Sequence, residues 1–175
     1  VNPAWDESTA VRGIQVLQDA GIELIEQPIG AREHAGLVRL ANRFNVPMLA
    51  DEAVQDARDG LDLVCGGFSG AFALKIAKSG GIYGVLELAH VAQAAGIGLY
   101  GGTLLEGTIG TAASLHAWAT LPAMAWGTEM FGPLLLQDDI VVSPLNYTEF
   151  GVELPQGAGL GITLDEDKLA HYSRK

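Results

Sequence analysis

Acidic and basic side chains stand directly after short apolar runs in this sequence, and three of them could do chemistry together. Glu26, Asp51 and Lys75 each follow such a run. Carboxylates are the hard oxygen ligands that Mg²⁺ or Mn²⁺ prefers. Burial and a nearby cation both lower the pKa of a lysine toward a value useful in proton transfer. A divalent ion beside a lysine stabilises negative charge next to a carboxylate, so this set indicates metal-assisted proton chemistry.

The apolar runs are predicted to be buried parallel strands. Pro28 cannot donate a ladder hydrogen bond, so it ends the first strand close to Glu26. A strand end with a merely solvated acid would be the simpler interpretation of any one run. The ends recur roughly every 25 residues, however, which is about the length of one strand-loop-helix-loop unit. Charged groups at the carboxyl ends of parallel strands converge on one face, where β/α barrels hold their active sites.

Helical patterns separate the predicted strands. Apolar residues at core spacing, with capping residues and glycines at the ends, predict helices between the strands up to about Phe131. After Phe131 the rhythm stops, and short β-like pieces precede a helix that starts near Leu164. We therefore divide the chain into a partial β/α barrel over 1–131 and an irregular β segment with a short helix over 132–175. The predicted helices cover 6–20, 32–45, 54–64, 82–95 and 107–121, and the β-like pieces cover 134–136, 140–142 and 150–154.

Composition excludes several classes of protein. The chain has 175 residues, of which 49% are hydrophobic and 18% are charged, as in a globular domain with its own core. A formal net charge of −11 argues against a nucleic-acid surface. Every apolar run is too short for a membrane span. The single Cys65 excludes an internal disulfide, fits a reducing cytoplasm and is interpreted as a buried structural thiol.

Glycines gather between the fourth predicted strand and the helix that follows it. Gly101, Gly102 and Thr103 lead into a loop, and Gly107 stands near the start of the helix. Free backbone N–H groups at a helix N-terminus can bind an anion. The spacing of the glycines matches neither a P-loop nor a dinucleotide fingerprint, so nucleotide binding is not expected.

Three motifs resemble the enolase superfamily: residues 23–28 (ELIEQP), 49–52 (LADE) and 72–78 (FALKIAK). Within that superfamily the chain looks most similar to the muconate cycloisomerases, and the resemblance covers essentially the whole sequence. It implies an α/β fold that is the C-terminal part of a (β/α)7β TIM-like barrel, with the N-terminal capping domain and the first barrel strands missing. The subgroup match rests on residues 96–103, 127–133 and 159–167.

The resemblance implies roles for individual residues. Glu26 and Asp51 match the second and third metal-binding acids of the family, and Glu52 matches the acid beside the third ligand. Lys75 matches the lysine on the sixth barrel strand, where it would act mainly as an electrostatic stabiliser. Glu129 matches the acid at the end of the eighth strand. Lys78, three residues after Lys75, is expected to be an ordinary loop lysine.

The start of the chain suggests a fragment. In the family the first metal-binding acid stands immediately before a Val-Asn pair such as Val1-Asn2, which would place Asn2 beside the metal site. The chain begins one residue later, with neither an initiator methionine nor a signal-peptide pattern. The Lys-x-Lys strand that supplies the main acid/base of the subgroup is also absent from the 175 residues. We therefore expect the isolated chain to be inactive and its parent to be the enzyme.

The resemblance implies the reversible conversion of cis,cis-muconate to a muconolactone in bacterial aromatic catabolism, with Mn²⁺ or Mg²⁺ as cofactor. The substrate would be a small dicarboxylate, with Gly101, Gly102 and Thr103 near its second carboxylate. Neither nucleic acid nor a membrane is an expected partner, and a cytoplasmic homo-oligomer is expected. A chloromuconate cycloisomerase remains the first alternative. Residues 99–106 and 129–133 disfavour dipeptide epimerases and o-succinylbenzoate synthases, and a non-catalytic half-barrel is the alternative from another class.

Overall fold

The computed structural model describes residues 2–173 and contains one four-stranded parallel sheet whose strands lie in chain order. A parallel bridge between Trp5 and Ile29 lies beyond its first strand, and another joins Gly101 to Thr128 beyond its last. Residues 126–129 continue the sheet only through that second bridge. The four strands are β1 (Ile25–Glu26), β2 (Met48–Ala50), β3 (Ala71–Leu74) and β4 (Gly98–Gly101).

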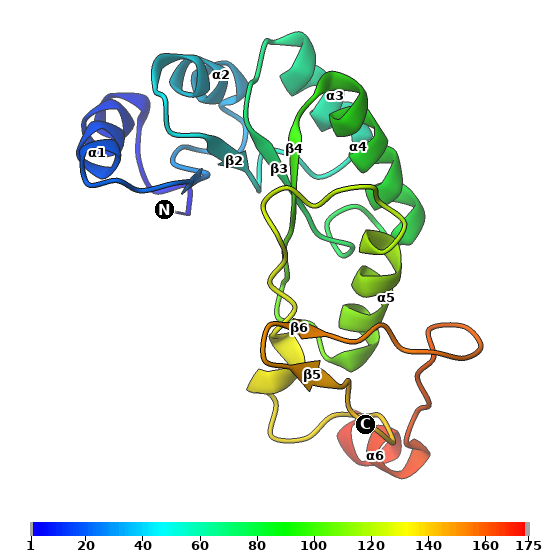
Figure 1. Ribbon diagram of the computed structural model, residues 1–175. Helices are drawn as coiled ribbons and strands as arrows, with labels where there is room; N and C mark the ends of the chain where they lie inside the picture. The colour runs from blue at the N-terminus through cyan, green and yellow to red at the C-terminus, as the bar shows by residue number, and fades with distance from the viewer. Residues whose placement is uncertain (1, 174–175) are drawn as a thin grey trace.

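A helix follows each of these strands, and another precedes the first. Figure 1 shows the first four helices in an arc along one side of the sheet, with the last of the five running toward the C-terminal region. Local sequence sets their ends: the Asp6 side chain accepts from the Thr9 N–H at 2.7 Å, and Gly96 ends its helix with a φ of 72° that glycine adopts without strain. The helices are α1 (Glu7–Asp19), α2 (His34–Arg43), α3 (Ala57–Cys65), α4 (Ile82–Ala95) and α5 (Thr108–Trp118).

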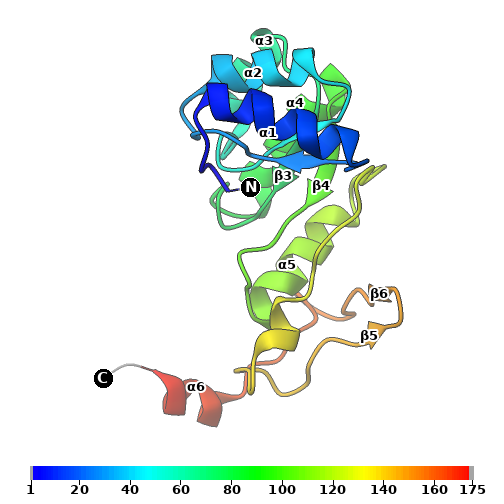
Figure 2. The same ribbon diagram turned by 90° about the vertical axis from the view of Figure 1, so that its left-hand side faces the viewer.

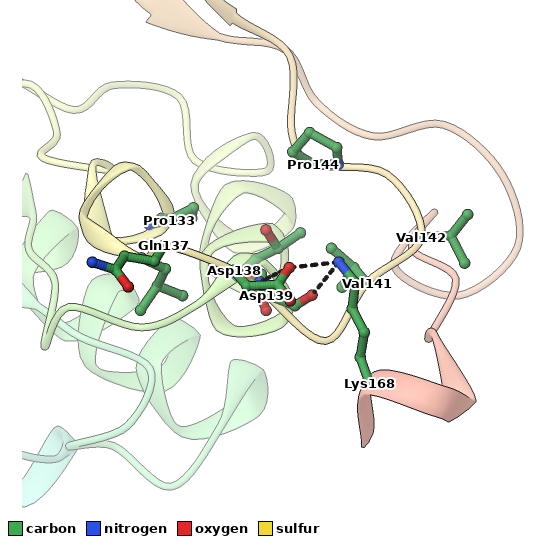
Figure 3. A pocket seen from close by; sticks show the side chains of 10 residues that line it. Pro133, Gln137, Asp138, Asp139, Val141, Val142, Pro144 and Lys168 are labelled. Carbon is green, nitrogen blue, oxygen red and sulfur yellow. Dashed lines mark hydrogen bonds and ion pairs between the residues drawn. The ribbon is translucent and has the colours of Figure 1, made fainter. Parts of the chain in front are cut away.

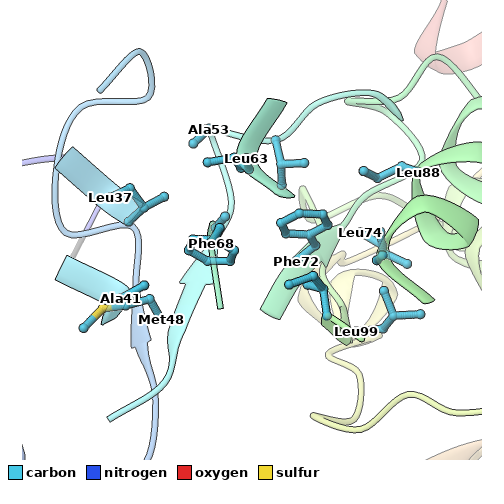
Figure 4. Close-up of a cluster of buried hydrophobic side chains, with 14 of the residues drawn as sticks. Leu37, Ala41, Met48, Ala53, Leu63, Phe68, Phe72, Leu74, Leu88 and Leu99 are labelled. Atoms are coloured by element: carbon cyan, nitrogen blue, oxygen red, sulfur yellow. The ribbon is translucent and has the colours of Figure 1, made fainter. Parts of the chain in front are cut away.

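The side chains along each strand alternate between two buried faces of the sheet. On β3, Phe72 and Leu74 belong to the main core, while Ala71 and Ala73 belong to a smaller cluster. The main core also takes side chains from the helices, such as Leu37, so this face of the sheet points to the helices (Figure 4). Successive side chains of a strand point to opposite faces, so the smaller cluster marks the inner face of the sheet.

This alternation decides where the predicted site residues point. Leu49 and Ala73 lie on the inner face; Asp51 and Lys75 follow them by two residues and continue that face. Glu26 directly follows Ile25, which belongs to the main core on the outer face. The sheet therefore directs Glu26, Asp51 and Lys75 to one face, as predicted from the strand ends.

After Phe131 regular structure is sparse, and Figure 2 shows this region extending away from the sheet. The prediction of a β-like piece at 134–136 was wrong: Gly132–Leu135 forms a 3₁₀ helix, η1, because Pro133 fits its first turn. The piece at 140–142 contains only an antiparallel bridge from Val141 to Leu164. The remaining elements are β5 (Tyr147–Thr148), β6 (Gly151–Val152) and α6 (Glu166–Tyr172). The division at 131/132 remains a prediction.

Two further observations concern exposure. Cys65 is exposed, so the predicted burial of its thiol was wrong. It is the last residue of α3, whose buried side is formed by Gly60 and Leu63. Among residues 2–173, no helix has the length and apolar character needed to cross a membrane.

Candidate metal and catalytic site

The carboxyl ends of β1, β2 and β3 bring Glu26, Asp51 and Lys75 together. Lys75 Nζ lies 2.5 Å from Asp51 Oδ2, and Glu26 and Asp51 are joined by a side-chain hydrogen bond. Asp51 is 4% exposed and Lys75 is 7% exposed. Three ionisable residues from three strands thus meet, and water scarcely reaches two of them, Asp51 and Lys75.

The two carboxylates differ in their affinity for protons. Burial raises the pKa of Glu26, and the hydrogen bond and negative charge of Asp51 raise it further, against the opposing charge of Lys75. Burial also acts to raise the pKa of Asp51. The charge of Lys78 and the hydrogen bonds from Lys75 and Lys78 outweigh it, so the pKa of Asp51 is lowered. Asp51 is therefore the carboxylate that stays ionised most readily.

Lys78 is not the ordinary loop lysine that the sequence predicted. Its Nζ lies 2.5 Å from Asp51 Oδ1, and burial lowers its pKa although the charge of Asp51 opposes the shift. The chain turns back just after β3, where the N–H groups of Lys78 and Ser79 both donate to the Lys75 carbonyl. This turn returns the Lys78 side chain to the strand ends.

Gln27 is a site residue that sequence reasoning missed. Its side chain is fully buried; Oε1 accepts from the backbone N–H groups of Asp51 at 2.9 Å and Ala53 at 3.1 Å, and Nε2 donates to the Ile29 carbonyl at 3.0 Å. Its φ of 32° is left-handed, a conformation that is uncommon outside glycine and occurs at functional sites. The available signal was an amide between Glu26 and a proline, which marks a strand end without revealing this role.

Gly102 gives Lys75 room to reach the site. A Cβ at Gly102 would lie 2.6 Å from Lys75 Cε and 3.1 Å from its Cγ, closer than atoms can approach without displacement. The Gly102 N–H donates to the Leu74 carbonyl at 2.9 Å, which holds the two residues side by side. Gly101 is constrained differently, because a Cβ there would meet Thr128 and Trp118 side-chain atoms.

Glu129 contacts the loop that follows β4 and contains Gly102 and Thr103. Its Oε1 accepts from the Thr103 N–H at 3.3 Å. Burial raises the pKa of Tyr100 well above its ordinary value, and the charge of Glu129 and a hydrogen bond to it add to the shift. Glu129 thus joins the loop after β4 to the inner-face residue Tyr100.

The N-terminus of α5, predicted to offer N–H groups to an anion, is capped from within the chain. The Thr108 N–H donates to Asp139 Oδ2 at 2.7 Å. Figure 3 shows Asp138 and Asp139 beside Lys168, whose Nζ lies 2.6 Å from Asp138 Oδ1 and 3.2 Å from the Asp139 carbonyl. This N-terminus therefore already holds a carboxylate, and the assignment of Gly101, Gly102 and Thr103 to substrate remains a prediction.

The donor set fits a hard divalent ion in part. Glu26 and Asp51 are adjacent carboxylates, and Glu52 Oε2, next in sequence, is buried with no hydrogen-bond partner among the described residues. Carboxylate oxygens are the ligands that Mg²⁺ and Mn²⁺ accept. No cluster of three or more His, Cys, Asp or Glu able to hold an ion is present within residues 2–173. Asn2 is exposed, and the roles of Glu26, Asp51 and Asn2 at a metal remain predictions.

The chain belongs to the enolase C-terminal domain-like family, whose model matches residues 1–168. It is 53% identical over 175 residues to muconate cycloisomerase 1 from Pseudomonas putida, covering 100% of this chain and 47% of that protein. It is 44% identical over 174 residues to a chloromuconate cycloisomerase from Cupriavidus necator, covering 99% of this chain and 47% of that protein.

The fold is shared with solved structures. A crystal structure of muconate lactonizing enzyme from Klebsiella pneumoniae superposes with a TM-score of 0.95 at 60% identity, covering 98% of this chain and 48% of that one. The expected enolase-superfamily fold is thereby confirmed. The chain spans about half the length of the relatives it matches.

Proposed function

We propose that the complete protein containing these 175 residues is a cycloisomerase that interconverts cis,cis-muconate and a muconolactone with the help of Mn²⁺ or Mg²⁺. The observation that carries the proposal is the meeting of Glu26, Asp51 and Lys75 at three strand ends. The 53% identity to a muconate cycloisomerase supports the choice of reaction.

Each residue of the site has a proposed task. Glu26 and Asp51 would hold the divalent ion, which supplies a fixed positive charge for a substrate carboxylate and for the enolate-like charge that develops beside it. Lys75 would stabilise that same charge from the other side, because its ammonium is buried and held in place before the reaction. Glu129 is also proposed to be a catalytic residue. It lies next to the loop that contains Thr103, whose backbone N–H donates to its side chain.

The second carboxylate of the substrate is proposed to lie near Gly101, Gly102 and Thr103. The loop begins where β4 ends and contacts both Lys75 and Glu129, so it borders the proposed reaction centre. The position of this loop beside Lys75 supports the assignment. The N-terminus of α5 does not support it, because Asp139 already caps that end of the helix.

A chloromuconate cycloisomerase is the second candidate, because a relative of that name is 44% identical over nearly the whole chain. We further infer a cytoplasmic homo-oligomer that works in aromatic catabolism, as the family resemblance implies. Residues 132–175 are proposed to pack toward a capping domain; the 94% exposure of Phe150 and 62% exposure of Leu134 support a surface that is covered in the complete protein.

The test is product analysis. The complete protein is incubated with cis,cis-muconate and with 2-chloromuconate in the presence of Mn²⁺, and the products are identified by NMR. The proposal expects muconolactone from the first substrate, and release of chloride from the second would favour the alternative. A well-folded protein that converts neither substrate would contradict both and favour a non-catalytic role.

A further inference from the structure

Lys78 is held by three protein acceptors at once. Its Nζ donates to Asp51 Oδ1 at 2.5 Å, to the Asp51 carbonyl at 2.7 Å and to the Ala73 carbonyl at 3.0 Å. An ammonium has three donors, so each can be matched to one of these acceptors. The side chain is only 10% exposed. Two of the three partners are backbone carbonyls, which cannot turn away as a side chain can.

This ammonium bridges two strands at the point where their ladder ends. β2 and β3 pair through Leu49 with Ala71 and Ala50 with Phe72. The next pair in that register would be Asp51 and Ala73, and Lys78 bonds to the carbonyls of both. Lys78 thus belongs to the scaffold of the sheet, and through Oδ1 it fixes how the Asp51 carboxylate is turned.

Lys75 holds the other oxygen of Asp51 in a different way. Its Nζ lies 2.5 Å from Asp51 Oδ2, the one hydrogen bond that it makes among the described residues, whereas Lys78 Nζ makes three. The Lys75 contact can therefore be exchanged for another cation more easily than the Lys78 contact. An ion that replaces Lys75 at Oδ2 would leave the Lys78 contact with Oδ1 in place.

We propose that Lys78 is a positioning residue that makes Asp51 a ligand through Oδ2 alone and thereby sets which divalent ion the site prefers. The inference rests on the proposed function, in which Asp51 binds an ion. Mg²⁺ demands near-ideal octahedral geometry, whereas Ca²⁺ takes about six to eight oxygens and accepts carboxylates through both oxygens. A carboxylate whose Oδ1 is kept occupied suits Mg²⁺ and disfavours Ca²⁺.

The test compares the binding of Mg²⁺ and Ca²⁺ to the complete protein by calorimetry. In Lys78→Met, the Asp51 carboxylate is free to turn, so Mg²⁺ affinity should fall about tenfold, as for other residues that orient a metal ligand. Ca²⁺ affinity should fall less or rise, which shifts the ratio of the two dissociation constants toward Ca²⁺. Lys168→Met is the matched control, because Lys168 also pairs with an aspartate, Asp138, at 2.6 Å; neither affinity should change.

An unchanged ratio in a folded Lys78→Met variant would overturn the proposal. So would a rise in affinity for both ions by the same factor, since that is the effect of removing a positive charge alone. If the variant fails to fold, a crystal structure of the unaltered protein with Mg²⁺ decides: the ion should bind Oδ2 with Oδ1 on Lys78, and an ion on Oδ1 would refute it. Failure of the unaltered protein to bind either ion would instead contradict the proposed function.

Discussion

Replacing Gln27 by leucine should destabilise the protein more than any other change to an uncharged residue of the site. The substitution places an apolar side chain in a fully buried position but removes the acceptor for the N–H groups of Asp51 and Ala53. Both residues are themselves buried, so water cannot take over. Each buried group left without a partner costs about 1–3 kcal/mol, so the two donors together cost about 2–6 kcal/mol.

Gln18 provides a matched control for this change. Its Oε1 also accepts from two backbone N–H groups, those of Asn45 at 2.9 Å and Val46 at 3.2 Å. Gln18 is only partly buried and the Asn45 N–H is exposed, so water can replace the amide. Gln18→Leu should therefore cost about 1 kcal/mol or less, the net value of an ordinary hydrogen bond.

The assay is urea unfolding of the complete protein followed by circular dichroism, with the free energy of unfolding taken from midpoint and slope. Hydrogen exchange of residues 49–54 gives a local measure, which should be faster in Gln27→Leu than in Gln18→Leu. Equal free energies of unfolding for the two variants, with equal exchange rates over that segment, would refute the claim that Gln27 holds the end of β2.

Two further predictions concern Lys75 and its neighbour. Lys75→Ala in the complete protein should slow turnover of cis,cis-muconate by about a hundredfold or more, as expected for loss of a preorganised charge, while Mn²⁺ binding is retained. Wild-type turnover in that variant would contradict the role of Lys75. Gly102→Ala should also slow turnover, because its Cβ would meet Lys75 Cε at 2.6 Å. Gly151→Ala, whose Cβ would have Thr148 Oγ1 at 3.5 Å as its nearest neighbour, should behave like the unaltered protein, and equal rates for the two glycine variants would refute this steric argument.

The strand ends could be predicted from sequence because two simple rules act together there. Apolar runs of strand length recur with helical patterns between them, and residues two apart on a strand share a face. These rules place Asp51 and Lys75 together without any knowledge of tertiary structure. The site assignment for Glu129, by contrast, depended on resemblance to a family.

The roles of Lys78 and Gln27 could not be predicted, because both depend on how the chain returns after a strand. Lys78 comes back to Asp51 only through the turn that begins at Lys75. Gln27 reaches the backbone of the neighbouring strand from a left-handed conformation that no local pattern signals. The exposure of Cys65 could not be predicted either, because neighbouring residues in the sequence do not show which way the side chain of the last helical residue points.

The most direct test of the account is a calorimetric titration of Mn²⁺ into the complete protein and its Glu26→Gln and Asp51→Asn variants. Both carboxylates are proposed ligands, so each variant should bind Mn²⁺ more weakly than the unaltered protein. Asp138→Asn is the control, because Asp138 is an exposed acid whose charge is paired with Lys168, and its Mn²⁺ affinity should match that of the unaltered protein. Unchanged affinity in both Glu26→Gln and Asp51→Asn would contradict the assignment of these strand ends as the metal site.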